Sequence, residues 1–163
     1  MSIPQELKTR PRWVCCTADK LPIDPKTGKA AASTDPMTWA DYATAAAAAA
    51  PLGCRGIGFV LGNGIAGIDI DHCIDPATGV VDERALAIVD AMQSYTELSP
   101  SGTGLHILFR GRKPGPACRR ALGDGVGLEM YDGGRYFTVT GRSWQDPPLP
   151  LADRTDEAAE IYK

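Results

Sequence analysis

Residues 56–61 and 64–71 are short apolar segments that contain many β-branched side chains, and Gly62-Asn63-Gly64 separates them. A turn of this composition between two such segments is typical of a β-hairpin. Residues 127–131 and 135–139 predict a second hairpin around Asp132-Gly133-Gly134. Further strands are expected at 12–17, 95–98 and 105–109, so β-sheet must form the framework of the fold.

Two helices are expected between these strands. The first begins at Asp35, a good N-cap, with Pro36 in its first turn; it includes the alanine run 45–50, and Pro51 and Gly53 end it. The second covers roughly 83–93, where apolar side chains recur at helical spacing and predict a buried face. Strand pairs combined with a few helices indicate an α+β fold.

The 163 residues suit one domain. We expect a catalytic domain over 1–143, followed over 144–163 by a proline-rich linker and the start of a capped helix at Thr155. This organisation predicts that a further C-terminal region follows.

The chain has no apolar run of about 18 residues, so no membrane span and no membrane partner are expected. The charged N-terminus lacks the apolar centre of a secretory signal. The five cysteines, which include no CxxC pair, are interpreted as reduced thiols rather than a zinc site. These features predict a cytoplasmic protein.

Asp69 and Asp71 are two residues apart in an apolar strand. Side chains alternate along a strand, so both carboxylates should lie on one face, about 7 Å apart at Cα. Two like charges on one face favour a divalent cation, and carboxylate oxygen suits Mg²⁺ or Mn²⁺. The same pattern also suits an edge strand whose polar face meets water.

The segment from Ser99 to His106 combines small hydroxyl residues with glycines at 102 and 104. Such a turn lets backbone N–H groups approach an anion closely, and His106 on the next strand could donate to a phosphate oxygen. Ordinary structural roles are the alternative for both. Arg135, which opens a later strand, could reach a triphosphate or be solvated.

Glu129 lies inside an otherwise apolar strand, where glutamate is uncommon and rarely buried without a partner. The net charge is −3, which argues against a nucleic-acid binder. However, residues 110–120 carry five basic side chains and no acidic one, in a Pro- and Gly-containing stretch that predicts a loop. The basic side chains are Arg110, Arg112, Lys113, Arg119 and Arg120.

The order of these motifs resembles the N-terminal primase-polymerase domain of phage and plasmid replication proteins, in the archaeo-eukaryotic primase superfamily. The similarity covers about residues 10–142. Its three motifs correspond to Asp69 with Asp71, to Ser101 with His106, and to Glu129. The resemblance implies an RRM-like palm beside a smaller N-terminal α/β subdomain, and often a helical or helicase region after them. Residues 75–82, which follow the first motif, depart from the family pattern and have no assigned chemical role.

The resemblance also implies a DNA primase and DNA polymerase that joins nucleotides by a two-metal mechanism. Asp69, Asp71 and Glu129 would hold two Mg²⁺ or Mn²⁺ ions. Ser101, Gly102, Gly104, His106 and Arg135 would bind the (d)NTP, and the basic residues of 110–120 would follow the phosphates of a single-stranded DNA template and its primer. The location would be the host cytoplasm if a phage encodes the chain.

Two other functions are also compatible with the sequence. A two-metal nuclease could use the same carboxylates but would need no triphosphate pocket. A non-catalytic module for single-stranded nucleic acid would favour exposed aromatic side chains on the sheet, where this sequence places acids. Since starting a primer needs more positioning than extending one, residues 1–163 are expected to extend an annealed primer better than they initiate.

Overall fold

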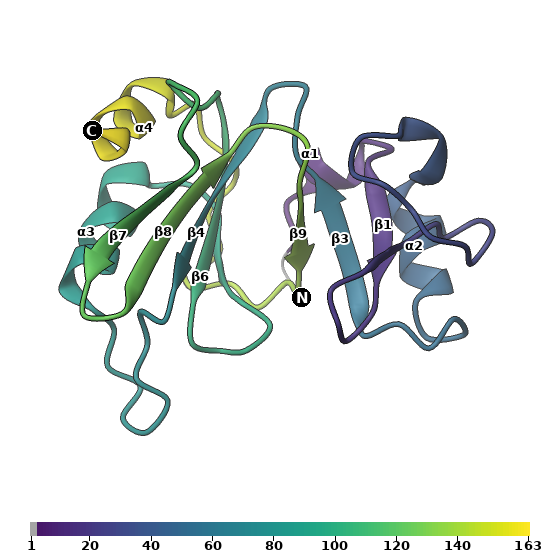
Figure 1. Ribbon diagram of the computed structural model, residues 1–163, viewed down its shortest axis with the longest axis horizontal. Coiled ribbons are helices and arrows are strands. Elements are labelled where there is room, and N and C mark those ends of the chain that lie inside the picture. Colours follow the sequence, from purple (N-terminus) through teal and green to yellow (C-terminus); the bar gives the residue numbers. More distant parts are fainter. Residues whose placement is uncertain (1–2) are drawn as a thin grey trace.

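The computed structural model describes residues 3–163 and contains two antiparallel sheets that lie side by side (Figure 1). The strands are β1 (Trp13–Cys16), β2 (Pro22–Ile23), β3 (Gly56–Val60), β4 (Ile65–Asp71), β5 (Thr96–Leu98), β6 (Leu105–Arg110), β7 (Arg119–Gly123), β8 (Val126–Tyr131) and β9 (Tyr136–Val139). The helices are α1 (Gln5–Lys8), α2 (Tyr42–Ala48), α3 (Glu83–Met92) and α4 (Thr155–Tyr162), with a 3₁₀ turn at Pro36–Thr38. The α+β class is confirmed.

The smaller sheet has the order β2-β1-β3-β9, and the larger one, which we call the palm, has the order β5-β6-β4-β8-β7. Helix α2 covers the outer side of the smaller sheet, while α3 and α4 lie on one face of the palm (Figure 1). Ile68 and Ile70 of β4 are fully buried in the core beneath α3. The aspartates that alternate with them therefore lie on the opposite face of the palm, as the period of a strand requires.

Both predicted hairpins are wrong as strand pairs. The turn after β3 does form, because Gly62 and Ile65 exchange backbone hydrogen bonds of 2.9 and 3.1 Å and Asn63 has a φ of 52°. Beyond that bridge the strands separate: β3 pairs with β1 and β9, whereas β4 pairs with β6 and β8. Strands β8 and β9 separate in the same way, so both connections cross from one sheet to the other.

The first helix begins later than predicted. Asp35 caps only the 3₁₀ turn, and Asp41 caps α2 by accepting a hydrogen bond of 2.7 Å from the Thr44 N–H. Between them Ala40 pairs with Trp13 through backbone hydrogen bonds of 2.8 and 3.0 Å. This extended pairing interrupts the helix that the alanine-rich sequence predicts. The second helix is confirmed, as α3.

Residues 144–163 pack on the palm. The backbone of Arg110 bonds with Ala152 and Arg154, at 2.9 and 3.0 Å, and Leu151 and Ala158 are buried in the core. Helix α4 lies beside α3 (Figure 1). The segment expected to be a linker is therefore part of the folded body, and a further region beyond it stays a prediction.

No helix among residues 3–163 is long and apolar enough to cross a membrane.

Candidate active site

A row of ionisable side chains crosses the palm at one level of the sheet. In the strand register Asp69 of β4 lies directly opposite His106 on one side and Glu129 on the other. The same pairing continues outward to both edges. From edge to edge the row consists of Glu97, His106, Asp69, Glu129 and Arg119. Because directly paired residues share a face, the register alone gathers side chains from five strands.

Three carboxylates of this face form a cluster. Asp69, Asp71 and Glu129 each offer an oxygen atom within 4.8 Å of those of the other two, and all three are half-buried. Among the described residues this is the one group of at least three acidic, histidine or cysteine side chains with such spacing. The structure thus brings together the three residues that the sequence predicted as metal ligands.

One oxygen of the Asp69 carboxylate has no hydrogen-bond partner in the described part of the chain, and a bound cation would be a partner for it. This Oδ1 atom is buried and accepts no hydrogen bond within residues 3–163, which is uncommon for a polar atom. Burial, followed by the charges of Asp71 and Glu129, raises the pKa of Asp69 to about 7. A divalent cation would relieve both causes, because it replaces the lost solvation and offsets the repulsion. The donor set fits Mg²⁺ or Mn²⁺, which prefer carboxylate oxygen.

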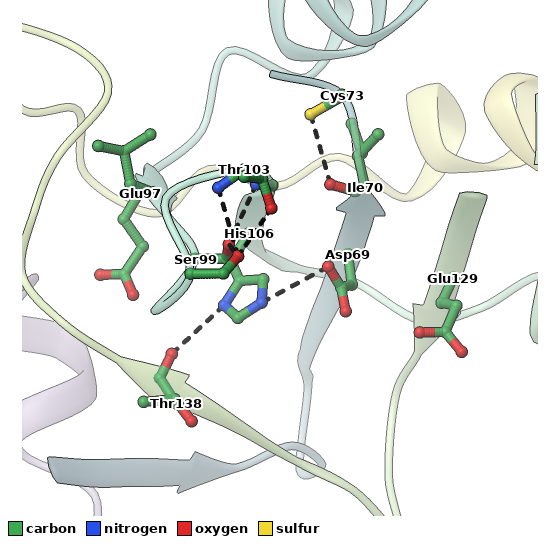
Figure 2. Close-up of polar contacts among 12 residues, drawn as sticks. Asp69, Ile70, Cys73, Glu97, Ser99, Thr103, His106, Glu129 and Thr138 are labelled. Atoms are coloured by element: carbon green, nitrogen blue, oxygen red, sulfur yellow. Dashed lines mark hydrogen bonds and ion pairs between the residues drawn. The ribbon is translucent and has the colours of Figure 1, made fainter. Parts of the chain in front are cut away.

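His106 connects the cluster to the smaller sheet. Its Nδ1 atom lies 3.3 Å from the carbonyl oxygen of Thr138 in β9, and its Nε2 atom lies 3.5 Å from Asp69 Oδ1 (Figure 2). A carbonyl can only accept, so Nδ1 donates and neutral His106 presents an Nε2 lone pair to the site. Burial lowers the pKa of His106 to about 4. Donation from Nε2 to a phosphate therefore requires the imidazolium form, which an anionic ligand would favour.

Glu129 is held by two donors. Arg119 Nε lies 2.6 Å from its Oε1 atom, and the Tyr131 hydroxyl donates to the same oxygen at 3.0 Å. The guanidinium of Arg135 lies over the Tyr131 ring, 4.9 Å from its centroid. Arg119 was predicted to contact DNA from a loop, but it lies on β7 and its guanidinium faces the carboxylate cluster.

The turn from Ser99 to Gly104 uses several of its own N–H groups. Gly102 N–H donates to the Ser99 carbonyl at 2.9 Å, and Gly104 N–H donates to Ser99 Oγ at 3.1 Å. Thr103 N–H faces Ser101 Oγ at 3.3 Å. These contacts fix the shape of the turn, from which Ser99 and Ser101 line the cavity described next.

A cavity of about 640 Å³ lies over the cluster, between the palm and the smaller sheet. Asp69, Asp71, Glu129, Ser101, His106 and Arg135 all line it. The remaining cations of its wall are Lys20, Arg55 and Arg119. No sequence motif indicates Lys20 or Arg55, which lie in the connections before β2 and β3 of the smaller sheet. Only the packing of two sheets brings them here.

Glu97 was also missed, although it is completely buried. Its carboxylate accepts hydrogen bonds from the Tyr95 hydroxyl and from the N–H groups of Thr140 and Gly141, at 2.7 to 3.0 Å. Burial raises its pKa. Glu97 thereby fixes the chain just after Thr138, whose carbonyl orients His106. The sequence feature that could have identified Glu97 is a glutamate within the short strand expected at 95–98.

The other basic residues of 110–120 lie outside this cavity. Arg110 pairs with Glu6 at 2.7 Å and lies 3.9 Å from Asp153, and Lys113 Nζ lies 2.9 Å from Cys118 Sγ. Arg112 and Arg120 are exposed, and Arg120 is on the edge strand β7.

No protein-family profile matches the chain. A DNA primase-polymerase of Nitratiruptor phage NrS-1 is 39% identical over 149 residues, which cover 86% of this chain and 21% of that protein. The chain therefore spans about a fifth of the length of this relative. The similarity supports a primase-polymerase domain and confirms the resemblance that the three motifs indicated.

Proposed function

Because the chain carries a domain of the primase-polymerase type, we propose that it is a template-directed nucleotidyltransferase that uses two divalent metal ions. The observation that carries the proposal is the row of Asp69, His106 and Glu129 beneath a cavity with four cations in its wall. Carboxylates suit metal ions, and the cations suit the phosphates of an incoming nucleotide. A single-stranded DNA template, its primer and a (d)NTP are the proposed substrates.

Asp69, Asp71 and Glu129 would hold the metal ions, and the unpartnered Asp69 Oδ1 supports this assignment. When bound, Mg²⁺ or Mn²⁺ supplies Lewis-acid activation of the primer hydroxyl and neutralises charge on the leaving pyrophosphate. Arg119 and Tyr131 orient Glu129, and the Thr138 carbonyl orients His106. These contacts place the ligand atoms before substrate arrives, which reduces the reorganisation needed in the transition state.

The nucleotide would lie between the two sheets. Ser101, on the turn shaped by Gly102 and Gly104, and His106, on the following strand β6, would contact its phosphates, and Arg135 lines the same cavity. Lys20 and Arg55 extend this set from the smaller sheet. Lys20, Arg55 and Arg135 are charged donors, and charged donors bind phosphate more strongly than neutral donors do.

The exposed Arg112 and Arg120 and the half-buried Lys113 remain proposed contacts to template phosphates. Arg110 and Arg119 join that surface only if they leave their carboxylate partners. We also propose action in the cytoplasm of a host cell, as part of a larger replication protein with a helical or helicase region.

Binding of a deoxynucleoside triphosphate in the absence of DNA tests the proposal. We expect Mg²⁺-dependent binding by calorimetry, weakened in His106→Ala and in Lys20→Ala. A two-metal nuclease or a single-strand binding module would bind DNA and no triphosphate, which would contradict the proposal. Val80→Ala is a suitable control because Val80 is exposed and lies outside the cavity.

A further inference from the structure

A second groove lies on the other side of Pro100 from the carboxylate cluster. It has a volume of about 410 Å³ and is lined by residues of α2, β3 and β9 and by the turn that contains Pro100. Arg55, Pro100 and Thr138 line both this groove and the catalytic cavity. The two spaces therefore adjoin, and a chain-like ligand could pass from one to the other.

Two guanidinium groups border the groove, and neither has an acidic partner. Arg55 Nη2 donates to the Pro100 carbonyl at 3.2 Å. Arg142 Nη2 donates to the carbonyls of Ser99 and Pro100, at 2.7 and 3.3 Å. No carboxylate among residues 3–163 forms an ion pair with either arginine. These hydrogen bonds hold the two guanidinium groups in place, and since both residues are exposed, their charge is available to an anion.

The groove wall between the arginines is apolar. Ile57 and Val139 contribute to it, with Tyr42 and Ala46 of α2 and Ala49 directly after that helix. Lys8 Nζ lies 5.0 Å from the centroid of the Tyr42 ring and adds a third cation nearby. Proteins that hold single-stranded nucleic acid combine cations for the phosphates with aromatic or apolar surfaces for the bases.

We propose that this groove binds the single-stranded template next to the nucleotide site. The inference rests on the proposed function and goes beyond it, since it adds Arg55 and Arg142 to the template contacts proposed for residues 110–120. A metal-bound nucleoside triphosphate also carries phosphates and is the alternative ligand for these arginines. The described lining contains no aspartate or glutamate, so the groove offers no carboxylate ligand for such a metal. The phosphates of a polynucleotide need none.

Ala46 allows a test that leaves the Ser99–Gly104 turn untouched. It is exposed on α2 and lines the groove, whereas the neighbouring Ala47 is exposed but does not. A carboxylate at 46 should repel template phosphates and an ammonium should attract them. We expect Ala46→Glu to weaken binding of a fluorescent oligodeoxythymidylate roughly 3- to 10-fold at low salt, Ala46→Lys to strengthen it, and Ala47→Glu to leave it unchanged.

A salt titration gives a second readout. Arg142→Gln should reduce the slope of log affinity against log salt by about 0.7 if Arg142 contacts one phosphate of a single strand. Equal oligonucleotide affinity in Ala46→Glu, Ala46→Lys and Ala47→Glu would overturn the inference. So would a loss confined to triphosphate binding, because the groove would then hold the free nucleotide.

These outcomes are separate from failure of the proposed function. If the wild-type chain binds the oligonucleotide with this charge dependence but incorporates no nucleotide, the groove stands and the catalytic assignment fails. If the chain extends a primer while the Ala46 variants bind normally, the catalytic assignment stands and the template path is elsewhere.

Discussion

At the scale of single residues, His106 and Glu129 flank Asp69 in the same row but make different contacts. His106 is fixed by a backbone carbonyl and faces the cavity, whereas Glu129 is fixed by Arg119 and Tyr131. These contacts favour a role for His106 in binding the triphosphate and for Glu129 in binding metal.

His106→Ala should therefore raise KM for the nucleotide, by an amount equivalent to about 1.5–3 kcal/mol for a hydrogen bond to a charged group. Glu129→Gln should lower kcat and shift the metal concentration that gives half-maximal rate. Steady-state kinetics with varied nucleotide and varied Mg²⁺ measures both. Identical defects in the two variants would contradict the division of roles.

The pH dependence of stability in EDTA is a second consequence at this scale. The pKa of Asp69 is about 7 in the folded protein against an ordinary 3.8, so the folded state holds this proton more tightly and loses stability as pH rises from about 4 to 7. The pKa of His106 is about 4 against an ordinary 6.5, so the unfolded state binds more protons and stability rises with pH over that range. The two effects oppose each other.

Asp69→Asn removes only the first effect. Its stability relative to wild type should therefore increase as pH rises from 4 to 7, as measured by urea unfolding in EDTA. Parallel wild-type and variant stability curves across this range would show that Asp69 does not titrate abnormally.

At the scale of elements, close approach of the two sheets depends on Gly67 of β4. A Cβ atom there would lie 2.4 Å from Cε2 of Phe137, whose ring lies 4.9 Å from the imidazole of His106. Gly67→Ala should displace that ring, cost about 1–3 kcal/mol as overpacking, and raise KM for the nucleotide. Thermal unfolding and kinetics measure the two effects.

Gly56→Ala provides the matched control. Gly56 is also a strand glycine, but a Cβ there meets no atom within 4 Å. It should be close to neutral in thermal unfolding. Equal effects of the two substitutions would contradict the close-packing argument.

The strands show how far local sequence predicts this molecule. Alternation in β4 correctly placed Asp69 and Asp71 on one face, because side-chain period is a local property. The turn at Gly62-Asn63-Gly64 was also correct, but a turn fixes only the local reversal and not the sheet in which each strand pairs. Lys20 and Arg55 could not be found, since their role depends on where the smaller sheet packs.

At the scale of the whole molecule, residues 144–163 stabilise the palm. Leu151 is buried in the core, and Arg154 Nε donates to the Met92 carbonyl at the end of α3. Leu151→Ala should cost about 2–5 kcal/mol, the range for a buried leucine, while Leu149→Ala at a half-buried position should cost less. A chain ending at residue 143 should be less stable still. Urea unfolding measures all three, and wild-type stability of the shortened chain would show that this segment is a free linker.

Primer extension is the measurement that addresses the carboxylate cluster most directly. With a primed single-stranded template, labelled deoxynucleotides and Mg²⁺ or Mn²⁺, the wild-type chain should extend the primer, and EDTA should stop it. Asp69→Ala and Asp71→Ala should each lower incorporation by about 100-fold or more, since several kcal/mol of charge stabilisation are lost. Their melting temperatures in EDTA should be unchanged or higher, because a repulsive pair is removed. Near wild-type incorporation by either variant would contradict the assignment of this cluster as the metal site of a nucleotidyltransferase.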